Sequence, residues 1–386
     1  MKIALVENFG LDFLNFRLPL VKYLEERGHE VYSIVPDDKY LEKVKAAGIR
    51  VLSFPLKKNT LNPVSFLRSA KAIRKFQNLH GFSVVHSFRL QPNIITSLAL
   101  GYKRKVKIVN HITGLGFAFA GKNPSSFFYR GLILFLYQIS FIFTNRIIVQ
   151  NETDLRIISR LAFTRSKLML LEGSGIDRNR FSRSNADMAI VESLRERLGL
   201  RPGDIVVTFT GRLLREKGIL EFLEVSNILS GKSEKMKFVI AGWFDYMNPS
   251  CLSRDELNSY LLDRRILFLE ECSEIRELLY LTDIFVLPTY REGFPRSVLE
   301  AMSMELPVVT TRVPGAMDAV KDGINGLLVP PRDVTALENA ITALSGDEGL
   351  RLKLGANGVR FVDEKLSTDV IFRKILDIYE SVSDAS

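Results

Sequence analysis

Short apolar runs alternate with longer amphipathic stretches along the whole chain. In the first half, the strand-like runs are KIALV (2–6), VYSIV (31–35), VLSF (51–54), SVVHS (83–87), VKIVN (106–110) and RIIVQ (146–150). In the second half, they are IVVTF (205–209), KFVIA (237–241), RILFL (265–269), DIFVLP (283–288), PVVTT (307–311) and GLLVP (326–330). Such runs, separated by helix-length segments, are typical of βαβ units whose parallel sheets are buried on both faces. The pattern predicts an α/β fold of two doubly wound Rossmann-like domains rather than a single barrel, which would need about eight strands.

The expected division between the domains falls in residues 173–188. This segment, GSGIDRNRFSRSNADM, is rich in Gly, Ser, Asn and Arg and has no apolar periodicity, as in a linker. We therefore expect domains at 1–180 and 181–366, and 386 residues are enough to give each a core. Residues 367–386 begin with an amphipathic stretch, which predicts a final helix that packs back on the first domain.

The charge is distributed unevenly between the two halves. The net charge is +9 overall, but residues 1–185 carry +17 and residues 186–386 carry −8. Residues 51–150 hold 14 basic residues and no acidic one. A region of one sign indicates an anionic partner, which can be nucleic acid, an anionic membrane or a phosphorylated substrate. The basic residues form two groups: Lys57, Lys58, Arg68, Lys71, Arg74 and Lys75, then Lys103, Arg104, Lys105 and Lys107.

Several classes of protein and site are disfavoured. Cys251 and Cys272 are too few for a disulfide framework and lack the spacing of a metal site, and no H-x-x-x-H pattern occurs among the four histidines. The N-terminus lacks the long apolar core of a signal peptide, so we expect none. The most apolar segment, 131–143, is shorter than the roughly 18–20 residues needed to span a bilayer, so no transmembrane helix is expected.

The segment TFTGRLLREKG places two cations at the end of a predicted strand. The strand ends at Gly211, and Arg212 and Lys217 bracket the turn that follows. In open α/β sheets, ligands bind beyond the carboxyl ends of the strands. A planar guanidinium and a mobile ammonium at such a turn suit a diphosphate, although an ordinary solvated basic turn would look the same.

The segment YREGFPRSVLEAM places two carboxylates around a small turn. Glu292 precedes Gly293, Phe294 and Pro295, and Glu300 follows on the next predicted helix. Pro295 fits the first helical turn, and the amides of residues 296–298 would then form an anion site. Carboxylates beside a phosphate site are favourable where they bind hydroxyl groups, which sugars and riboses supply. Helix stabilisation at about 0.3–1 kcal/mol explains one of these acids but not both.

Two glycine-containing loops follow predicted strands of the basic half. FGLDFLNFR, with Gly10, follows the first strand, and NHITGLGFAFAG follows the fifth. Both would face the second domain across a cleft.

The chain resembles retaining glycosyltransferases of family 4, which have the GT-B fold of two Rossmann-like domains facing a central cleft. The resemblance covers most of residues 205–335 and rests on GRLLREKGILEFLE and on LLYLTDIFVLPTYREGFPRSVLEAMSMELPVVTTRVPGAMDAVKDGINGLLVPPRD. In the first half, NFRLPL and ITGLGFAF are more loosely similar to the subgroup that acts on polyprenyl-diphosphate-linked sugars.

This resemblance implies roles for individual residues. Arg212 and Lys217 would hold the donor diphosphate, Glu292 the donor sugar and Glu300 the ribose, with Arg212, Lys217 and Glu292 as the catalytic set. The implied nucleotide-sugar site comprises Gly10, Gly211, Arg212, Lys217, Cys272, Glu292, Gly293, Phe294, Pro295, Arg296 and Glu300. The implied acceptor site comprises Asn15, Arg17, His111, Thr113, Gly114 and Gly116. No metal ion or cofactor is implied, because fixed cations and helix amides can stabilise the leaving charge.

Three positions leave questions open. Glu305 and Glu270 stand where the family usually has glycine. His111 could contact the sugar or the acceptor, and a structural histidine is an equal alternative.

The function expected from the resemblance is transfer of an N-acetylhexosamine, with GalNAc the first choice, and with retention of configuration. The donor would be a UDP-sugar and the acceptor a polyprenyl-diphosphate-linked sugar, at an anionic membrane surface on the cytoplasmic face. One alternative is another hexosyl transfer in surface-polysaccharide or glycolipid assembly. A second is a UDP-sugar 2-epimerase-type GT-B enzyme, and a third is a basic nucleic-acid-binding module, for which no recognition motif is evident.

Overall fold

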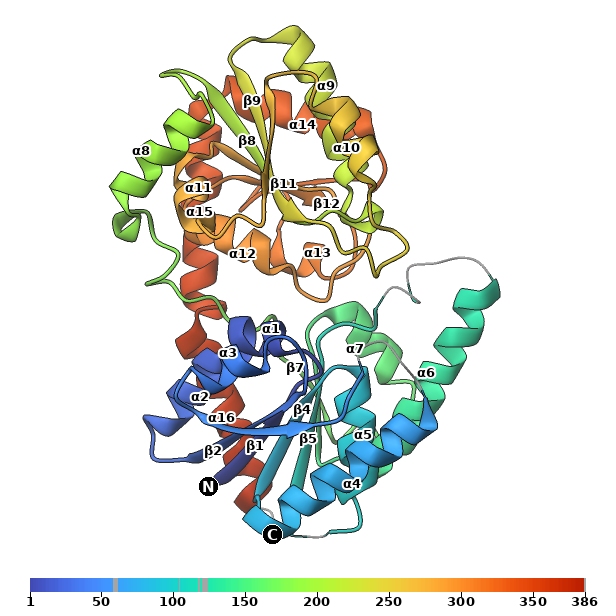
Figure 1. Ribbon diagram of the computed structural model, residues 1–386. Coiled ribbons are helices and arrows are strands. Elements are labelled where there is room, and N and C mark those ends of the chain that lie inside the picture. Colours follow the sequence, from blue (N-terminus) through green and yellow to red (C-terminus); the bar gives the residue numbers. More distant parts are fainter. Residues whose placement is uncertain (58–61, 104, 117–118, 120–123, 385–386) are drawn as a thin grey trace. The chain divides into compact units, whose positions relative to one another are not determined.

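A computed structural model describes residues 1–57, 62–103, 105–116, 119 and 124–384 (Figure 1). The chain forms two compact units, one of residues Met1–Gly173 with Ile371–Ser386 and the other of Ser174–Val370. We refer to them as the first and second domains.

The first domain is built on a seven-stranded sheet with the order β3-β2-β1-β4-β5-β6-β7, and every neighbouring pair is parallel. The strands are β1 (Lys2–Val6), β2 (Glu30–Pro36), β3 (Arg50–Phe54), β4 (Val84–Phe88), β5 (Lys107–Ile112), β6 (Arg146–Val149) and β7 (Leu168–Leu170). The helices are α1 (Gly10–Asp12), a π-helical turn (Phe13–Arg17), α2 (Leu18–Glu25), α3 (Leu41–Lys45), α4 (Pro63–His80), α5 (Leu90–Leu100), α6 (Pro124–Ile142) and α7 (Glu152–Ile158).

The second domain is built on a six-stranded parallel sheet with the order β10-β9-β8-β11-β12-β13. The strands are β8 (Ile205–Arg212), β9 (Met236–Trp243), β10 (Ile266–Glu270), β11 (Ile284–Leu287), β12 (Val308–Thr311) and β13 (Leu327–Val329). The helices are α8 (Met188–Arg197), α9 (Ile219–Lys232), α10 (Arg254–Tyr260), α11 (Ile275–Leu281), α12 (Arg296–Ser303), α13 (Ala316–Ala319), α14 (Val334–Gly346) and α15 (Glu348–Lys365), with 3-10 turns at Arg183–Asn185 and Arg215–Lys217.

The predicted fold class is confirmed, and all twelve predicted runs are strands. β7 was not predicted, because its three residues at the sheet edge are too few to show a pattern. The domain boundary lies at Gly173/Ser174 instead of 180/181. The reason is that the segment after Gly173 is anchored to the second domain: the amide of Ile176 donates to Leu366, and Arg178 pairs with Asp363 at 2.7 Å.

The C-terminal helix α16 (Thr368–Asp384) belongs to the first domain from Ile371 onward. Its apolar face is buried, and it includes Ile371, Ile375 and Ile378. The hydroxyl of Tyr379 on this face lies 2.5 Å from Nδ1 of His86 on β4. The amphipathic pattern of the last residues thus corresponds to a helix whose partner lies far away in sequence.

Both sheets have a point where the strand order reverses, between β1 and β4 in the first and between β8 and β11 in the second. Ligands of doubly wound folds bind at the carboxyl ends of such strands, so these are the places to look for a site. Within the described ranges, every helix is too short or too polar to cross a membrane.

Candidate active site

The loops after β8 and β11 bring together two of the three predicted catalytic residues, Lys217 and Glu292. Lys217 ends the 3-10 turn that follows β8, and Glu292 lies in the loop between β11 and α12. Nζ of Lys217 lies 2.5 Å from Oε1 of Glu292, and their side chains are 21% and 11% exposed. The sequence assigned these residues to different parts of a donor, and the structure shows them as one ion pair.

The backbones of these two loops are held against each other. The amide of Tyr290 donates to the carbonyl oxygen of Glu216 at 2.8 Å, and the Thr289 hydroxyl donates to the same oxygen at 3.1 Å. Gly218 has φ 75°, and a Cβ there would lie 2.0 Å from the carbonyl oxygen of Pro288. Only glycine suits this conformation and this close approach. Gly218 is therefore a site-forming residue that was not predicted, and its signal was its place directly after Lys217.

A third loop, after β12, supports Glu292 from its other side. The amide of Glu292 donates to the carbonyl oxygen of Pro314 at 3.1 Å. Gly315 has φ 80°, and a Cβ there would lie 2.5 Å from the carbonyl oxygen of Glu292 and 2.6 Å from that of Gly293. The position of the Glu292 carboxylate thus depends on contacts between three strand-end loops.

Helix α12 begins one residue later than predicted. Pro295 is its N-cap, with φ −75° and ψ 104°, rather than a residue of the first turn. An extended ψ at the N-cap is normal, because the helix begins only at the next residue. Nε of Arg296 lies 2.9 Å from Oε1 of Glu300, so the predicted ribose-binding carboxylate is paired one turn along the same helix. Phe294 is half-buried in the turn between Glu292 and this helix.

Arg212, the last residue of β8, also has a carboxylate partner. Its Nη1 lies 2.8 Å from Oδ2 of Asp245, and the two side chains are 38% and 25% exposed. Asp245 follows β9, the strand beside β8, so the strand-end rule could have identified it from the sequence. Gly211 and Gly242 allow the two strand ends to approach, since a Cβ on Gly242 would lie 2.2 Å from the Gly211 carbonyl oxygen.

Tyr290 links the same loops through its side chain. Its hydroxyl donates to Oε1 of Glu221, a buried carboxylate in the first turn of α9, and the guanidinium of Arg332 lies 4.4 Å from the ring centroid. Burial raises the pKa of Tyr290, and the hydrogen bond to Glu221 raises it further. Tyr290 therefore stays protonated and fixes the loop that carries Glu292. No pattern in the sequence marked this connection.

Three further second-domain positions that the sequence singled out, Cys272, Glu305 and Glu270, have interactions within their own loops or with a neighbouring helix. Burial raises the pKa of Cys272 to about 11, so this thiol, 3.6 Å from Oε2 of Glu274, remains neutral. Glu305 has φ 63°, and its amide and that of Leu306 donate to Met302 and Ala301. These are the bonds of a Schellman motif, in which the left-handed position favours glycine. Glu270 ends β10 and pairs with Arg254 at 2.7 Å, while the left-handed residue is its neighbour Glu271, with φ 50°.

The first domain holds a cluster of charged and aromatic side chains at its own reversal point. Glu7 after β1 is fully buried and accepts from Nε of Arg17 at 3.1 Å. The Arg17 guanidinium lies 3.6 Å from the Phe88 ring centroid. Arg89 has φ 73° and completes the cluster by pairing with Glu7 at 3.4 Å and with Asp12 at 2.7 Å. We call Glu7, Asp12, Arg17 and Arg89 the first-domain charge cluster, in which Glu7 and Arg17 are buried and Asp12 and Arg89 are 18% and 32% exposed.

Burial dominates the protonation of this region. It raises the pKa of Glu7 against the opposing effect of Arg89 and Arg17, and it lowers the pKa of Arg17. Burial also lowers the pKa of His86 and of His111 well below the usual histidine value, and their rings stack 5.4 Å apart. Both histidines are therefore neutral at physiological pH.

Two of the predicted acceptor residues are linked to this cluster: Arg17 belongs to it, and the carbonyl oxygen of His111 accepts from the amide of Arg89 at 2.9 Å. His111 is 1% exposed, and neither of its ring nitrogens has a hydrogen-bond partner among the described residues. Thr113, Gly114 and Gly116 follow on the loop after β5, where φ is 137° at Gly114 and 81° at Gly116. The amide of Leu115 donates to Asp154 at 3.1 Å and anchors this loop.

The other first-domain candidates differ in exposure. Asn15 is exposed on the π-helical turn, whereas Arg17 two residues later is buried. Gly10 donates its amide to Oδ2 of Asp38 at 2.8 Å, and a Cβ there would lie 2.7 Å from the other Asp38 oxygen. The donor role of Gly10 and the acceptor roles of the first-domain residues remain predictions.

Two family models match the chain. Residues 190–361 match "Glycosyl transferases group 1", and residues 2–151 match "Glycosyl transferase 4-like". Each match lies within one of the two domains.

Two relatives named as transferases match most or nearly all of the chain. The chain is 30% identical to the N,N'-diacetylbacillosaminyl-diphospho-undecaprenol alpha-1,3-N-acetylgalactosaminyltransferase of Campylobacter jejuni, over 99% of each chain. It is 22% identical to the UDP-Gal:alpha-D-GlcNAc-diphosphoundecaprenol alpha-1,3-galactosyltransferase of Escherichia coli, over 87% of this chain and 88% of that one.

Among solved structures, Anabaena HepE in complex with UDP and glucose superposes with a TM-score of 0.79. The two sequences are 18% identical, and the match covers 99% of this chain and 100% of HepE. At 18% identity this structural similarity supports the assignment of the fold alone, which is the GT-B fold. From the two family matches and the full-length relative, the chain belongs to the family 4 glycosyltransferases with the GT-B fold.

Proposed function

We propose that this glycosyltransferase transfers an N-acetylhexosamine, with GalNAc the first choice, from a UDP-sugar to a sugar carried on polyprenyl diphosphate. The observation that carries the proposal is the full-length similarity to an undecaprenol-linked GalNAc transferase, together with the Lys217–Glu292 pair at the strand ends. The named relatives are transferases, so the epimerase and nucleic-acid alternatives have no support among them. Transfer of a plain hexose is the second candidate, because the Escherichia coli relative is a galactosyltransferase.

The proposed chemistry retains the anomeric configuration. The acceptor hydroxyl oxygen forms a bond to the sugar C1, the bond from C1 to the diphosphate oxygen breaks, and the acceptor proton passes to the departing UDP. Arg212 and Lys217 would stabilise the negative charge that develops on the diphosphate, together with the first-turn amides of α12. Each cation already has a carboxylate partner, so binding the donor exchanges a carboxylate for a phosphate.

The donor and acceptor can be tested with one panel of assays. UDP-GalNAc, UDP-GlcNAc, UDP-Gal and GDP-Man would each be offered with a short-chain polyprenyl-diphosphate sugar, and the anomeric linkage of the product would be read by NMR. We expect the highest kcat/KM with UDP-GalNAc and an α-linked product. Preference for UDP-Gal would select the second candidate, and turnover with GDP-Man alone would refute the UDP assignment.

We also propose that the reaction needs no metal ion, since Arg212, Lys217 and the α12 amides supply the positive charge. We expect full activity after dialysis against EDTA. Loss of activity that returns with Mg²⁺ or Mn²⁺ would contradict this. The cytoplasmic face of the bacterial membrane is the proposed place of action, because UDP-sugars and lipid-linked acceptors would meet there.

A further inference from the structure

Three helices form one outer layer of the first domain. Helix α5 packs against both α4 and α6, and all three lie on the same side of the sheet (Figure 1). They fall within the stretch that has basic residues and no acidic ones. We call the solvent-facing side of α4 and α6, with the end of α5 between them, the α4–α6 surface.

Helix α6 carries apolar side chains both on the side that faces the core and on the side that faces solvent. Inward, it buries Ile133, Tyr137 and Phe141 in the core. Outward, it exposes five large apolar side chains: Phe127 (60%), Phe128 (70%), Tyr129 (49%), Phe135 (60%) and Ile142 (51%). A surface helix normally turns polar residues to water, and several large apolar side chains exposed on one helix indicate a contact. The predicted apolar run is thus buried on one face and exposed on the other.

Helix α4 combines cations and apolar side chains on its outer face. Val64, Leu67 and Leu79 are 56%, 63% and 71% exposed. Between them lie four exposed cations: Arg68, Lys71, Arg74 and Lys75. The spacing of three and four residues places these side chains on one side of the helix. Lys58 and Arg104, which belong to the predicted basic groups, lie outside the described residues.

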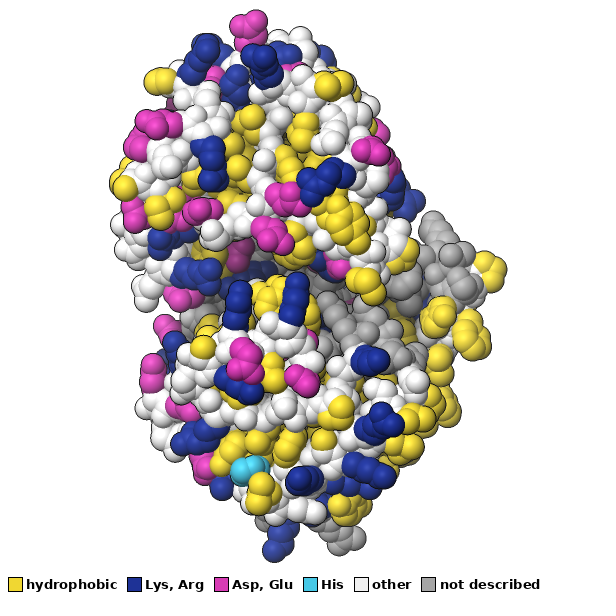
Figure 2. All heavy atoms as spheres, viewed as in Figure 1, with side chains coloured by type: hydrophobic (Ala, Val, Ile, Leu, Met, Phe, Trp, Pro, Cys, Tyr) yellow, Lys and Arg dark blue, Asp and Glu magenta, His cyan; other side chains and the backbone are white. Residues whose placement is uncertain are grey.

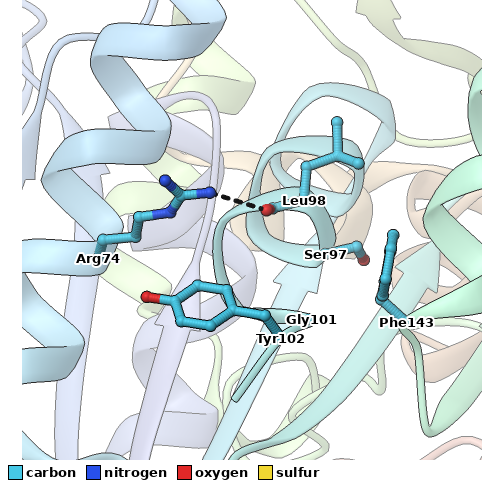
Figure 3. A pocket seen from close by; sticks show the side chains of 6 residues that line it. All are labelled: Arg74, Ser97, Leu98, Gly101, Tyr102 and Phe143. Atoms are coloured by element: carbon cyan, nitrogen blue, oxygen red, sulfur yellow. Dashed lines mark hydrogen bonds between the residues drawn. The ribbon is translucent and has the colours of Figure 1, made fainter.

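A hollow of about 430 Å³ lies within this surface where α4 meets the end of α5 (Figure 3). Arg74 reaches across it and donates to the carbonyl oxygens of Ala99 at 2.9 Å and Leu98 at 3.4 Å. Tyr102 and Phe143, which are 61% and 39% exposed, form its other walls. The hollow therefore joins the cationic face of α4 to the aromatic side chains near α6. Figure 2 shows apolar and basic side chains side by side over this part of the first domain.

We propose that the α4–α6 surface binds an anionic lipid bilayer, with the outward aromatic side chains of α6 in the headgroup region and the α4 cations on lipid phosphates. Either signal alone gives weak, reversible binding, and the two together give stable attachment. Each cation near an anionic leaflet contributes about 1 kcal/mol, which is about fivefold in partitioning. The proposal rests on the proposed function, because attachment to the bilayer would bring the enzyme to an acceptor that is carried on a membrane lipid.

A second copy of the chain is a poorer occupant of the same surface. Every charged side chain of residues 51–150 is positive, so two copies that met through these faces would bring like charges together. An anionic bilayer instead complements the cations and takes up the aromatic side chains. The charge pattern therefore favours a lipid surface.

Vesicle flotation of the full chain tests this surface directly. One variant would carry Arg68→Glu, Lys71→Glu and Lys75→Glu, and another Phe128→Ser and Phe135→Ser. Matched controls on exposed positions of the second domain are Lys235→Glu with Arg264→Glu and Lys353→Glu, and Met247→Ser with Leu262→Ser. We expect strong binding to phosphatidylglycerol-containing vesicles, weak binding to phosphatidylcholine vesicles, and at least about a hundredfold loss in the cation variant. The aromatic variant should also bind less, and both controls should bind like the wild type.

The outcomes separate this proposal from the proposed function. Both surface variants should keep wild-type activity on a short-chain soluble acceptor and lose activity on a long-chain acceptor in vesicles. Equal binding to both vesicle types, or equal losses in the controls, would overturn the docking surface while leaving the transferase intact. Vesicle binding without transfer to any polyprenyl-diphosphate sugar would refute the acceptor and keep the surface. A dimer that dissociates in the Phe128→Ser/Phe135→Ser variant would assign the surface to a second copy instead.

Discussion

The two domains place charged side chains at the carboxyl ends of their central strands, but they differ in how deeply those charges are buried. In the first domain Glu7 is fully buried and Arg17 is 4% exposed. In the second domain the side chains of Lys217, in the 3-10 turn after β8, and Arg212, at the end of β8, are 21% and 38% exposed. A buried pair is costly to separate, whereas a partly exposed pair can exchange its partner at small cost. The Glu7–Arg17 pair is therefore the costlier one to break, and the second domain's pairs are better suited to exchange a partner for a ligand.

The net charges of the domains run opposite to the charges at these sites. The second half of the chain is net negative, yet it supplies the two cations proposed for the diphosphate. The first half is strongly positive, yet the charges at its strand ends are largely neutralised by one another. Its excess positive charge is found instead on outer surfaces such as α4. The net charge of a domain thus indicates which charged partners its surface attracts. The side chains at the strand ends indicate which ligand its site can bind.

The largest effect we expect is on stability, from Arg17→Met. The buried Glu7 would keep Arg89, 3.4 Å away, and lose its closer cation, which costs up to about 3–5 kcal/mol, the cost of breaking a buried ion pair. The free energy of unfolding, measured in urea, should fall by that amount, and hydrogen exchange should quicken at β1 and β4. The double variant Glu7→Gln/Arg17→Met should recover part of the loss. Normal stability with a raised KM for the acceptor would instead assign Arg17 to acceptor binding.

The second effect is on turnover, from Lys217→Ala and Arg212→Ala. Loss of a donor that stabilises developing charge lowers kcat by roughly two to three orders of magnitude. Both side chains are partly exposed, so the melting temperature should change little. Lys232→Ala is the control, because Lys232 forms a similar pair with Glu338 at 2.6 Å on the far part of α9. A variant of Arg212 or Lys217 with near-normal kcat at saturating donor would show that the diphosphate lies elsewhere.

The sequence predicted the parts of this comparison that depend on periodicity and missed those that depend on packing. Twelve strands and the positions of Arg212, Lys217, Glu292 and Glu300 follow from apolar runs and their ends. The pairing of Lys217 with Glu292 does not follow, because it arises from the approach of three loops whose backbones meet at Gly218 and Gly315. The burial of Arg17 was likewise hidden, since its partner Glu7 belongs to a different element.

Acid should weaken the first domain before the second. His86 and His111 have pKa values well below the histidine value because of burial, while in the unfolded chain they titrate near 6.5. As the pH falls below about 6.5, these histidines become protonated in the unfolded state but stay neutral in the folded state. The free energy of unfolding therefore falls. Between pH 6.5 and 5.5 the loss should be about 1 kcal/mol for each histidine.

The same window should leave the second domain almost unaffected. Its carboxylates with lowered pKa values include Asp263, held by Arg265, and Glu256, whose pKa is about 2, so both stay ionised at pH 5.5. Hydrogen exchange on the full chain at both pH values, followed by peptide analysis, would report the domains separately. His86→Gln/His111→Gln should remove most of the pH dependence from the first-domain peptides, and the remainder should come from His29, whose pKa burial also lowers. Parallel loss of protection in both domains would show that buried histidines do not control it.

The smallest effect we expect separates the two acids of the second domain. Glu300→Gln should weaken UDP binding about tenfold, since an amide oxygen replaces a carboxylate that accepts two ribose hydroxyls and charged hydrogen bonds contribute about 1.5–3 kcal/mol. Glu292→Gln should leave UDP affinity nearly unchanged and lower turnover, because its carboxylate is assigned to the sugar and holds Lys217. Calorimetric titration with UDP and with the UDP-sugar would measure both differences. Arg296→Gln is a useful companion, because it releases Glu300 from its 2.9 Å partner without touching the carboxylate. Equal losses of UDP affinity in the Glu292 and Glu300 variants would mean that the two acids act on the nucleotide together.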